Sequence, residues 1–329
     1  MLGMMLVSLL VLSLIFTAVP NVLWLVVWLI AKCFHYSMPY APFGWTAFGL
    51  VAFAWIVMAY GYFFGRFKLD VKKWEYVNKD IPAAFNGYKI VHISDLHLST
   101  FDDSPKQLQR FIDSINAQNP DLICFTGDMV SLGVEEAEPY IEMLKGMKTK
   151  DGVVSVLGNH DFLLYRFRRD STFDREAAVE RLDSMQRNVL GWHLLRNDSY
   201  VIERNGEKIT IVGVDNKNCS NQGFRTIDRG DLSKAMQSTD GFRILLTHDP
   251  SHWRGEVVGQ TDIPLTLCGH THAAQVRLFG WTPASWTFRD TDGRYDENGQ
   301  TLYVNVGLGC TLPIRLGANA EITVITLRN

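Results

Sequence analysis

The chain has 329 residues, a formal net charge of −3 and charged side chains at 20% of its positions. This length exceeds that of a typical single domain, so we expect one large domain with an additional segment. The nearly balanced charge lacks the basic excess of nucleic-acid-binding proteins, so no nucleic-acid partner is predicted. The charges are unevenly distributed, because Lys32 is the only charged residue before Arg66. The first part of the chain therefore suits an apolar environment, and the second part suits water.

Two uncharged, apolar runs lie in the first part of the chain, at residues 1–31 and 44–65. Each is long enough for the roughly 20 residues that cross the hydrocarbon core of a bilayer. Residues 32–43 contain Pro39 and Pro42 and predict a short loop between the runs. A signal peptide or a buried core helix is the alternative, but the first five residues lack the positive charge of a signal peptide. We therefore expect a membrane anchor of two transmembrane helices over residues 1–66.

The flanking charges predict the orientation of this anchor. The basic residues that follow the second run are Arg66, Lys68, Lys72, Lys73 and Lys79. Positive charge stays inside, so the large C-terminal part is expected on the cytoplasmic side of a membrane, the inner membrane of a bacterium. The five cysteines are dispersed and odd in number: Cys33, Cys124, Cys219, Cys268 and Cys310. They indicate a reducing compartment without a disulfide framework.

The second part of the chain is expected to contain a linker, residues 67–88, and one domain, residues 89–329. Short apolar runs rich in β-branched residues predict buried strands at residues 89–93, 122–125, 153–157, 209–214, 244–246, 265–268, 302–306 and 322–327. Residues 107–117 and 136–147 each predict a helix with one apolar face. Strands that alternate with helices and are then followed mainly by strands indicate a layered α/β sandwich with two sheets.

Polar residues collect directly after five of the predicted strands. The motifs are Asp95-Leu96-His97, Gly127-Asp128, Gly158-Asn159-His160-Asp161, Thr247-His248-Asp249 and Gly269-His270-Thr271-His272. Ligand sites of α/β sheets lie beyond the carboxyl ends of strands. Each motif alone has a structural alternative, such as a helix cap for an Asp or a turn for Gly-Asn. Their joint occurrence in this order indicates a single site.

This ordered set of motifs resembles the calcineurin-like metallophosphoesterases, over residues 89–327. Residues 306–315 and 320–323 resemble a narrower branch that includes membrane-associated phosphodiesterases and a UDP-2,3-diacylglucosamine pyrophosphatase of lipid A synthesis. The resemblance implies a two-sheet α/β/β/α metallophosphoesterase sandwich, here preceded by the two transmembrane helices. It also implies a hydrolase of phosphate esters or phosphoric anhydrides.

The resemblance further implies two adjacent divalent metal ions. The first would be held by Asp95, His97, Asp128 and His272. The second would be held by Asp128, Asn159, His248 and His270, so that Asp128 bridges the two. Imidazole with oxygen ligands suits Mn, Fe or Zn, and we favour Mn. A metal pair roughly 3.5–4 Å apart would polarise the phosphoryl oxygens and generate a bridging hydroxide at neutral pH.

His160 has no metal in this assignment and is expected to face the phosphate, where it stabilises charge or protonates the leaving oxygen. Asp161 is expected to orient the His160 ring. The alternative is that His160 is a turn residue without a role. We interpret His252 as a surface residue or a support for the ligands, and Asp249 as a structural neighbour of them.

Residues 162–169 mix apolar, aromatic and basic groups in an expected loop beside the phosphate. Arg166, Arg168 and Arg169 are predicted to bind a pyrophosphate or a lipid headgroup, and the alternative is a helix with a solvated basic face. A second aromatic segment, residues 281–288, is expected to form the other wall of the substrate site.

These observations predict hydrolysis of a phosphodiester or pyrophosphate, in a lipid-linked nucleotide such as UDP-2,3-diacylglucosamine. One alternative is a broad phosphodiesterase or phosphatase that acts on soluble substrates. Another is a non-catalytic, metal-binding membrane scaffold. No obligate protein partner is predicted.

Overall fold

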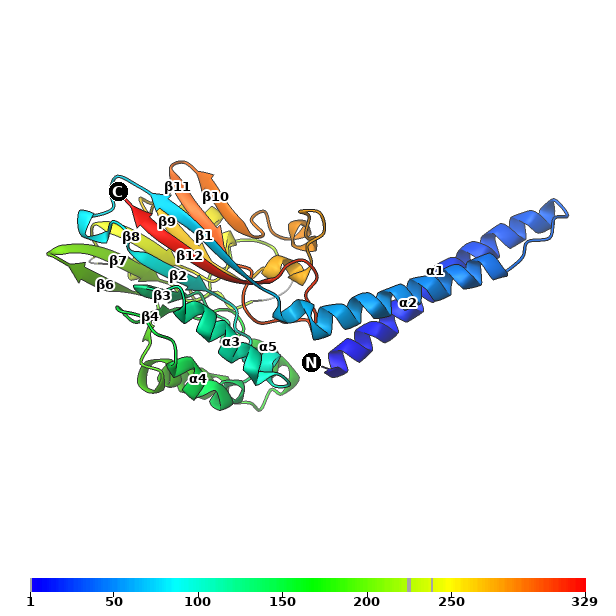
Figure 1. Cartoon of the computed structure of the whole chain (residues 1–329), viewed down its shortest axis with the longest axis horizontal. Coiled ribbons are helices and arrows are strands. Elements are labelled where there is room, and N and C mark those ends of the chain that lie inside the picture. The colour runs from blue at the N-terminus through cyan, green and yellow to red at the C-terminus, as the bar shows by residue number, and fades with distance from the viewer. Residues whose placement is uncertain (1, 224–225, 238) are drawn as a thin grey trace. The chain divides into compact units, whose positions relative to one another are not determined.

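The computed structural model describes residues 2–223, 226–237 and 239–329 (Figure 1). The chain divides into two compact units. The smaller unit comprises Met1–Arg66 with Leu312–Arg315, and the larger unit comprises Phe67–Thr311 with Leu316–Asn329.

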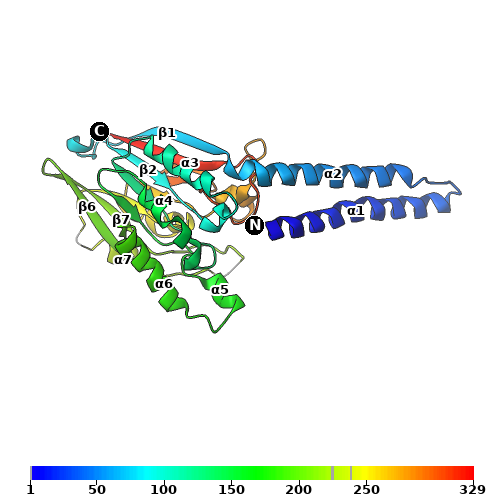
Figure 2. The same ribbon diagram turned by 60° about the horizontal axis from the view of Figure 1, so that its bottom comes forward.

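The smaller unit is built on two long helices, α1 (Leu2–Cys33) and α2 (Ala41–Phe63), which lie side by side as a hairpin (Figures 1 and 2). Trp55 of α2 donates a hydrogen bond from Nε1 to Ser13 Oγ of α1, at 2.9 Å. Both helices are long and apolar enough to cross a membrane, which confirms this part of the sequence prediction. In the most apolar stretch of α1 only 11% of the residues are buried, so α1 is not the buried core helix of a soluble protein.

The larger unit contains two six-stranded sheets. The first sheet has the order β1 (Leu69–Val77), β12 (Ala320–Arg328), β2 (Lys89–Ile93), β3 (Leu122–Phe125), β4 (Val153–Ser155) and β5 (His193–Leu194). The second sheet has the order β10 (Gly293–Glu297), β11 (Gln300–Val304), β9 (Leu265–Cys268), β8 (Phe242–Leu246), β7 (Glu207–Gly213) and β6 (Asp198–Arg204). Within these sheets β2, β3, β4 and β5 run parallel, as do β7, β8, β9 and β11. The carboxyl ends of both parallel sets can therefore carry one site.

Successive side chains of a strand point to opposite faces of its sheet, and together they form three apolar layers. Ile90 of β2 and Ile244 of β8 share the core between the two sheets. Their neighbours point the opposite way: Val91 packs with Phe111 of α3 (Pro105–Asn116), and Leu245 packs with Trp253. The helices α4 (Ile141–Lys145) and α6 (Arg175–Ser184) also cover the outer face of the first sheet, and α7 (Leu232–Ala235) lies against the second. This arrangement confirms the predicted two-sheet α/β fold.

The expected linker over residues 67–88 was wrong in its first half. Strand β1 lies there and pairs in parallel with β12 along its whole length, from Leu69 opposite Ala320 to Val77 opposite Arg328. The strand was missed because it forms the edge of its sheet, where charged side chains such as Lys72 replace an apolar run. The expected helix over residues 136–147 is also shorter, since Pro139 lies in a separate 3₁₀ turn before α4.

Candidate metal centre

The seven residues expected to hold metal ions come together at the carboxyl ends of five strands. Asp95 and His97 follow β2, Asp128 follows β3, and Asn159 follows β4. His248 follows β8, and both His270 and His272 follow β9. The first sheet thus contributes the carboxylates, the carboxamide and one imidazole, and the second sheet contributes three imidazoles.

One group of donor atoms surrounds Asp95 and His272. The Nε2 atom of His272 lies 3.2 Å from Asp95 Oδ1 and 3.2 Å from the Nε2 atom of His97. The Nε2 atom of His97 lies 3.6 Å from Asp128 Oδ2. The other oxygen of Asp95, Oδ2, accepts a hydrogen bond from the backbone N–H of His270 at 3.0 Å. Asp95 Oδ1 is buried and faces His272 Nε2 and, at 3.9 Å, His248 Nε2.

A second group surrounds His248. Its Nε2 atom lies 3.1 Å from Asp128 Oδ2, 3.1 Å from Asn159 Oδ1 and 3.2 Å from the Nδ1 atom of His270. Asp128 Oδ2 therefore belongs to both groups, which suits a bridging carboxylate. Burial opposes ionisation of Asp128, but the charges of His248 and His160 outweigh it and hold the pKa of this carboxyl below its ordinary value.

The hydrogen bonds on the far sides of the rings determine which nitrogens bear protons. His248 Nδ1 lies 2.7 Å from the carbonyl oxygen of Thr126, which can only accept, so Nδ1 donates and a neutral His248 has its lone pair on Nε2. Gln222 donates from Nε2 to the carboxylate of Asp249, which directs Gln222 Oε1 to His270 Nε2 at 3.1 Å. His270 therefore donates from Nε2 and has its lone pair on Nδ1.

The donor atoms test whether the residues fit divalent cations. His248 Nε2 and His270 Nδ1 face each other and the oxygen atoms of Asp128 and Asn159. Burial opposes protonation of His248, but the charges of Asp128 and Asp95 outweigh it and raise its pKa to about 10, so a cation bound here would replace a proton on Nε2. Imidazole nitrogen with carboxylate and carboxamide oxygen is a donor set typical of Mn, Fe or Zn. The residues fit a pair of such ions.

Five of the seven residues adopt a backbone conformation that side chains normally avoid. The φ angle is positive at Asp95 (50°), His97 (39°), Asp128 (60°), His270 (75°) and His272 (49°). Each such residue costs on the order of 1 kcal/mol, and strain of this kind concentrates at functional sites. The fold therefore holds these side chains in place against their local preference.

Glycines make room for the ligands in two of the motifs. A Cβ atom at Gly158 would lie 2.2 Å from Asp128 Oδ1 and 2.7 Å from His248 Cε1. A Cβ atom at Gly269 would lie 1.9 Å from Ser94 Oγ and 2.3 Å from Asp95 Oδ2. The glycine of each motif is therefore required by the close approach of a ligand from another strand.

The expectation that Asp161 orients the His160 ring was wrong. The buried Asp161 carboxylate accepts hydrogen bonds from the backbone N–H groups of Asp128 (2.7 Å), Met129 (2.8 Å), Gly158 (3.0 Å) and Val130 (3.2 Å). Asp161 thus joins the loop after β3 to the loop after β4. The His160 ring donates instead from Nδ1 to the carbonyl oxygen of Ser131, at 2.9 Å. Asp161 positions two metal-binding loops rather than a ring.

His160 lies at the edge of the first group. Its ring centroid is 4.8 Å from that of His97, and its backbone N–H donates to Asp128 Oδ1 at 2.8 Å. The ring of Tyr165, on helix α5 (Leu164–Arg169), also contacts the His160 ring, with centroids 4.5 Å apart. The Tyr165 hydroxyl accepts a hydrogen bond from Asn159 Nδ2 at 3.1 Å, which directs Asn159 Oδ1 to His248.

Sequence reasoning missed Tyr165 and Gln222, which act through Asn159 and His270. Neither residue lies in a motif, and no periodic pattern singles them out. His252 was placed at the surface or near the ligands. It is buried, bonds Thr247 Oγ1 through Nδ1 at 3.0 Å, and faces Glu256 at 3.3 Å through Nε2. It is therefore a packed residue of the domain, and the surface interpretation was wrong.

The three arginines lie on a helix rather than in the expected loop. Arg166, on α5, bonds Glu135 at 2.9 Å and lies over the Phe173 ring at 4.2 Å. Arg168 and Arg169 are exposed on the same helix. The segment is therefore helical, as the alternative expected, and the role of these arginines in substrate binding stays a prediction.

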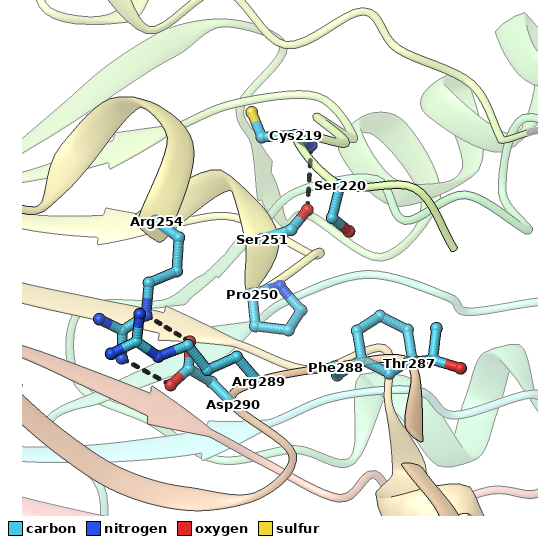
Figure 3. A pocket seen from close by; sticks show the side chains of 9 residues that line it. All are labelled: Cys219, Ser220, Pro250, Ser251, Arg254, Thr287, Phe288, Arg289 and Asp290. Atoms are coloured by element: carbon cyan, nitrogen blue, oxygen red, sulfur yellow. Dashed lines mark hydrogen bonds and ion pairs between the residues drawn. The ribbon is translucent and has the colours of Figure 1, made fainter. Parts of the chain in front are cut away.

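A cavity of about 240 Å³ lies in the larger unit, with Pro250 and Phe288 among its walls (Figure 3). It is lined by Cys219, Ser220, Pro250, Ser251, Arg254, Thr287, Phe288, Arg289 and Asp290. The Phe288 ring meets the His270 ring edge to face, with centroids 5.4 Å apart. Arg254 forms two hydrogen bonds of 2.7 Å with Asp290 and so closes one end. The aromatic segment, residues 281–288, therefore reaches the candidate metal centre through Phe288.

Comparison with known proteins places this site in context. The family model of the calcineurin-like phosphoesterases matches residues 88–274. The chain is 30% identical over 295 residues to the uncharacterized metallophosphoesterase YkuE of Bacillus subtilis, across 86% of this chain and 95% of that protein. It is 32% identical over 254 residues to a Danio rerio protein named transmembrane protein with metallophosphoesterase domain, across 75% of this chain and 55% of that relative. The chain thus spans about half the length of the latter. A solved dimetal phosphatase from Danio rerio aligns with 69% of this chain at 14% identity and a TM-score of 0.44.

Proposed function

Because the chain belongs to the calcineurin-like metallophosphoesterase family, whose members hydrolyse phosphoester bonds, we propose that it cleaves a phosphodiester or pyrophosphate at the candidate metal centre. The observation that carries this proposal is the convergence of four donor atoms, in which His248 Nε2 lies 3.1 Å from Asp128 Oδ2, 3.1 Å from Asn159 Oδ1 and 3.2 Å from His270 Nδ1. Imidazole nitrogens gathered this closely with carboxylate and carboxamide oxygens form a donor set for divalent cations.

Two divalent ions, with Mn favoured, are proposed to bind here. The first is held by Asp95, His97, Asp128 and His272. The second is held by Asp128, Asn159, His248 and His270. When bound, such a pair supplies positive charge to the phosphoryl oxygens and acidity to a water molecule.

His160 is proposed as the group that acts on the leaving oxygen. Its Nδ1 atom donates to the Ser131 carbonyl, so the ring can present only Nε2 to a substrate. The tilted contact with the Tyr165 ring and the T-shaped contact with His97 limit rotation of the ring. A protonated His160 can then transfer a proton from Nε2, or stabilise negative charge on the phosphoryl group.

The substrate is proposed to carry an organic group on its phosphate. The cavity lined by Phe288, whose ring contacts His270, can take a ring-sized substituent, with Phe288 and Pro250 as apolar walls. A lipid-linked nucleotide such as UDP-2,3-diacylglucosamine satisfies this requirement. The exposed apolar surfaces of α1 and α2, and the relative named a transmembrane protein, support membrane association. The charges after α2 favour a cytoplasmic domain at a bacterial inner membrane.

The test is an assay of the full chain, purified in detergent with Mn, on UDP-2,3-diacylglucosamine and on bis-p-nitrophenyl phosphate. Release of UMP that is lost in Asp128→Ala would support the lipid pyrophosphatase. Turnover of the small diester alone would support the proposed phosphodiester hydrolysis and exclude this lipid as the substrate. Bound metal without turnover of either substrate would contradict the proposal and favour a non-catalytic scaffold.

A further inference from the structure

Three two-residue turns of the larger unit share one backbone geometry. The turn between β6 and β7 contains Asn205 (φ 52°) and Gly206 (φ 80°), and that between β10 and β11 contains Asn298 (φ 55°) and Gly299 (φ 75°). Asn-Gly is the pair that such a turn favours, because Asn tolerates the left-handed conformation. The third turn has Phe279 (φ 51°) before Gly280 (φ 85°), closed by two hydrogen bonds between Leu278 and Trp281 of 2.9 and 3.0 Å.

Phe279 therefore destabilises the turn relative to Asn at the same position. Burial of its side chain does not offset this cost. Its exposed fraction is 109%, that of a side chain fully in solvent. Three further large apolar side chains are exposed around it: Leu278 (53%), Trp281 (44%) and Trp286 (80%). The Trp281 and Trp286 rings contact each other with centroids 5.3 Å apart. We call Leu278, Phe279, Trp281 and Trp286 the aromatic patch.

The charge of the segment has one sign. Residues 276–289 contain no Asp or Glu, and their two charged residues, Arg277 and Arg289, lie at either end of the segment. Arg277 forms an ion pair with Asp292. The Arg289 side chain is 74% exposed, and its guanidinium lies 3.8 Å from the Glu297 carboxylate. An exposed cation thus accompanies the apolar side chains.

We infer that the aromatic patch docks onto an anionic lipid surface, with Phe279 and the two indoles at the membrane interface. Trp, Phe and Leu beside Arg are the residues that bind this interface, where indole rings lie at the level of the headgroups. Phe279 lies at the tip of a turn with its side chain fully in solvent, so it can enter lipid. The chain also contains two helices apolar enough to cross a membrane, which would keep lipid at high local concentration.

The segment that carries the aromatic patch adjoins the candidate metal centre along the chain. It begins directly after the 3₁₀ turn His272–Gln275, and Phe288 near its end contacts His270. Docking would therefore present the site to molecules held in the bilayer. This consequence rests on the proposed function, whereas the docking itself is independent of that function.

The experiment measures the depth of a spin label in the full chain, reconstituted in phosphatidylcholine vesicles with and without phosphatidylglycerol. The exposed Cys33 and Cys219 are first replaced, as Cys33→Ser and Cys219→Ser. The label is attached at Ser285→Cys, which lies in the segment, or at Asn205→Cys, at the tip of a turn of the same geometry. Accessibility of the label to oxygen and to a nickel chelate separates lipid, water and protein environments.

We expect the label at residue 285 to favour oxygen over the chelate, more strongly with phosphatidylglycerol, and the label at residue 205 to remain in water. The variant Phe279→Asn restores the favoured turn residue, so we expect it to fold with an equal or higher melting temperature and to lose this lipid signature. Hydrolysis of bis-p-nitrophenyl phosphate should be unchanged in Phe279→Asn, which separates docking from catalysis. A label at residue 285 that is as accessible to the chelate as that at residue 205, or shielded from both reagents, would overturn the inference.

Discussion

The Nε2 atom of His248 and the Nδ1 atom of His270 lie 3.2 Å apart, and each ring uses its other nitrogen to donate a hydrogen bond. The partner of His248 is a backbone carbonyl, and the partner of His270 is a carboxamide that Asp249 holds in one orientation. Both rings thereby direct their remaining nitrogen to the same space. The hydrogen-bond network, rather than the ligands alone, prepares the site for cations.

Removal of metal should destabilise the domain. Ions that bind only the folded state contribute about 2.7 kcal/mol at a concentration of 100 times Kd. We therefore expect the melting temperature of the full chain to rise with added Mn and to fall with a chelator. In Asp128→Ala, which removes the shared carboxylate, the melting temperature should no longer depend on Mn. An equal dependence in both proteins would show that the ions bind elsewhere.

Asp161→Asn should damage the fold, whereas His160→Gln should not. The Asp161 carboxylate accepts four backbone hydrogen bonds, and a carboxamide would turn an N–H donor toward some of these N–H groups. We expect the free energy of unfolding to fall by about 2–4 kcal/mol in Asp161→Asn, together with weaker metal binding. His160→Gln should keep stability and metal content but lose turnover. Equal stability of the two variants, measured by denaturant titration, would contradict the role assigned to Asp161.

Tyr165→Phe should weaken metal binding without removing a ligand. The hydroxyl that holds Asn159 Nδ2 is lost, so the Asn159 carboxamide can rotate away from His248. Loss of such a supporting partner lowers metal affinity by roughly 10–100-fold, a change that titration calorimetry can measure. Tyr140→Phe is the matched control, because it also removes a hydroxyl, one that bonds Asp102 at 3.1 Å. Its metal affinity should equal that of the unaltered chain.

Asp121 should stabilise the domain only above acidic pH. Burial opposes its ionisation, but hydrogen bonds from Lys150 (2.7 Å) and from the backbone N–H of Lys89 (2.7 Å) outweigh burial and lower the pKa of the carboxyl. A carboxyl with a lower pKa in the folded state contributes stability above its unfolded pKa, and this contribution is lost as the pH falls through the folded pKa. Asp121→Asn should therefore cost about 1–3 kcal/mol at neutral pH and progressively less in acid. A cost independent of pH in urea titrations would contradict this interpretation.

Much of the architecture follows from local patterns in the sequence. The strands at residues 89–93, 122–125 and 265–268 have the predicted bounds, because a short, fully buried strand is a short apolar run. The long apolar helices follow from their length and lack of charge. The ligand residues could be named because each directly follows a strand, and parallel strands present their carboxyl ends together.

Other features depend on contacts between residues far apart in the chain. Strand β1 is polar enough to resemble a linker, and only its pairing with β12 makes it part of the sheet. Asp161 was predicted to orient the ring of its sequence neighbour His160. Its hydrogen bonds instead join two loops that are far apart in the chain.

The sequence by itself determined which residues bring imidazole and carboxylate to the site and which helices are apolar, because those properties belong to single residues and short segments. The tertiary structure decided the direction of each lone pair, the partner of each buried carboxylate and the full exposure of Phe279. Those properties depend on what a side chain meets after the chain has folded. Only the packing of distant segments supplies those neighbours.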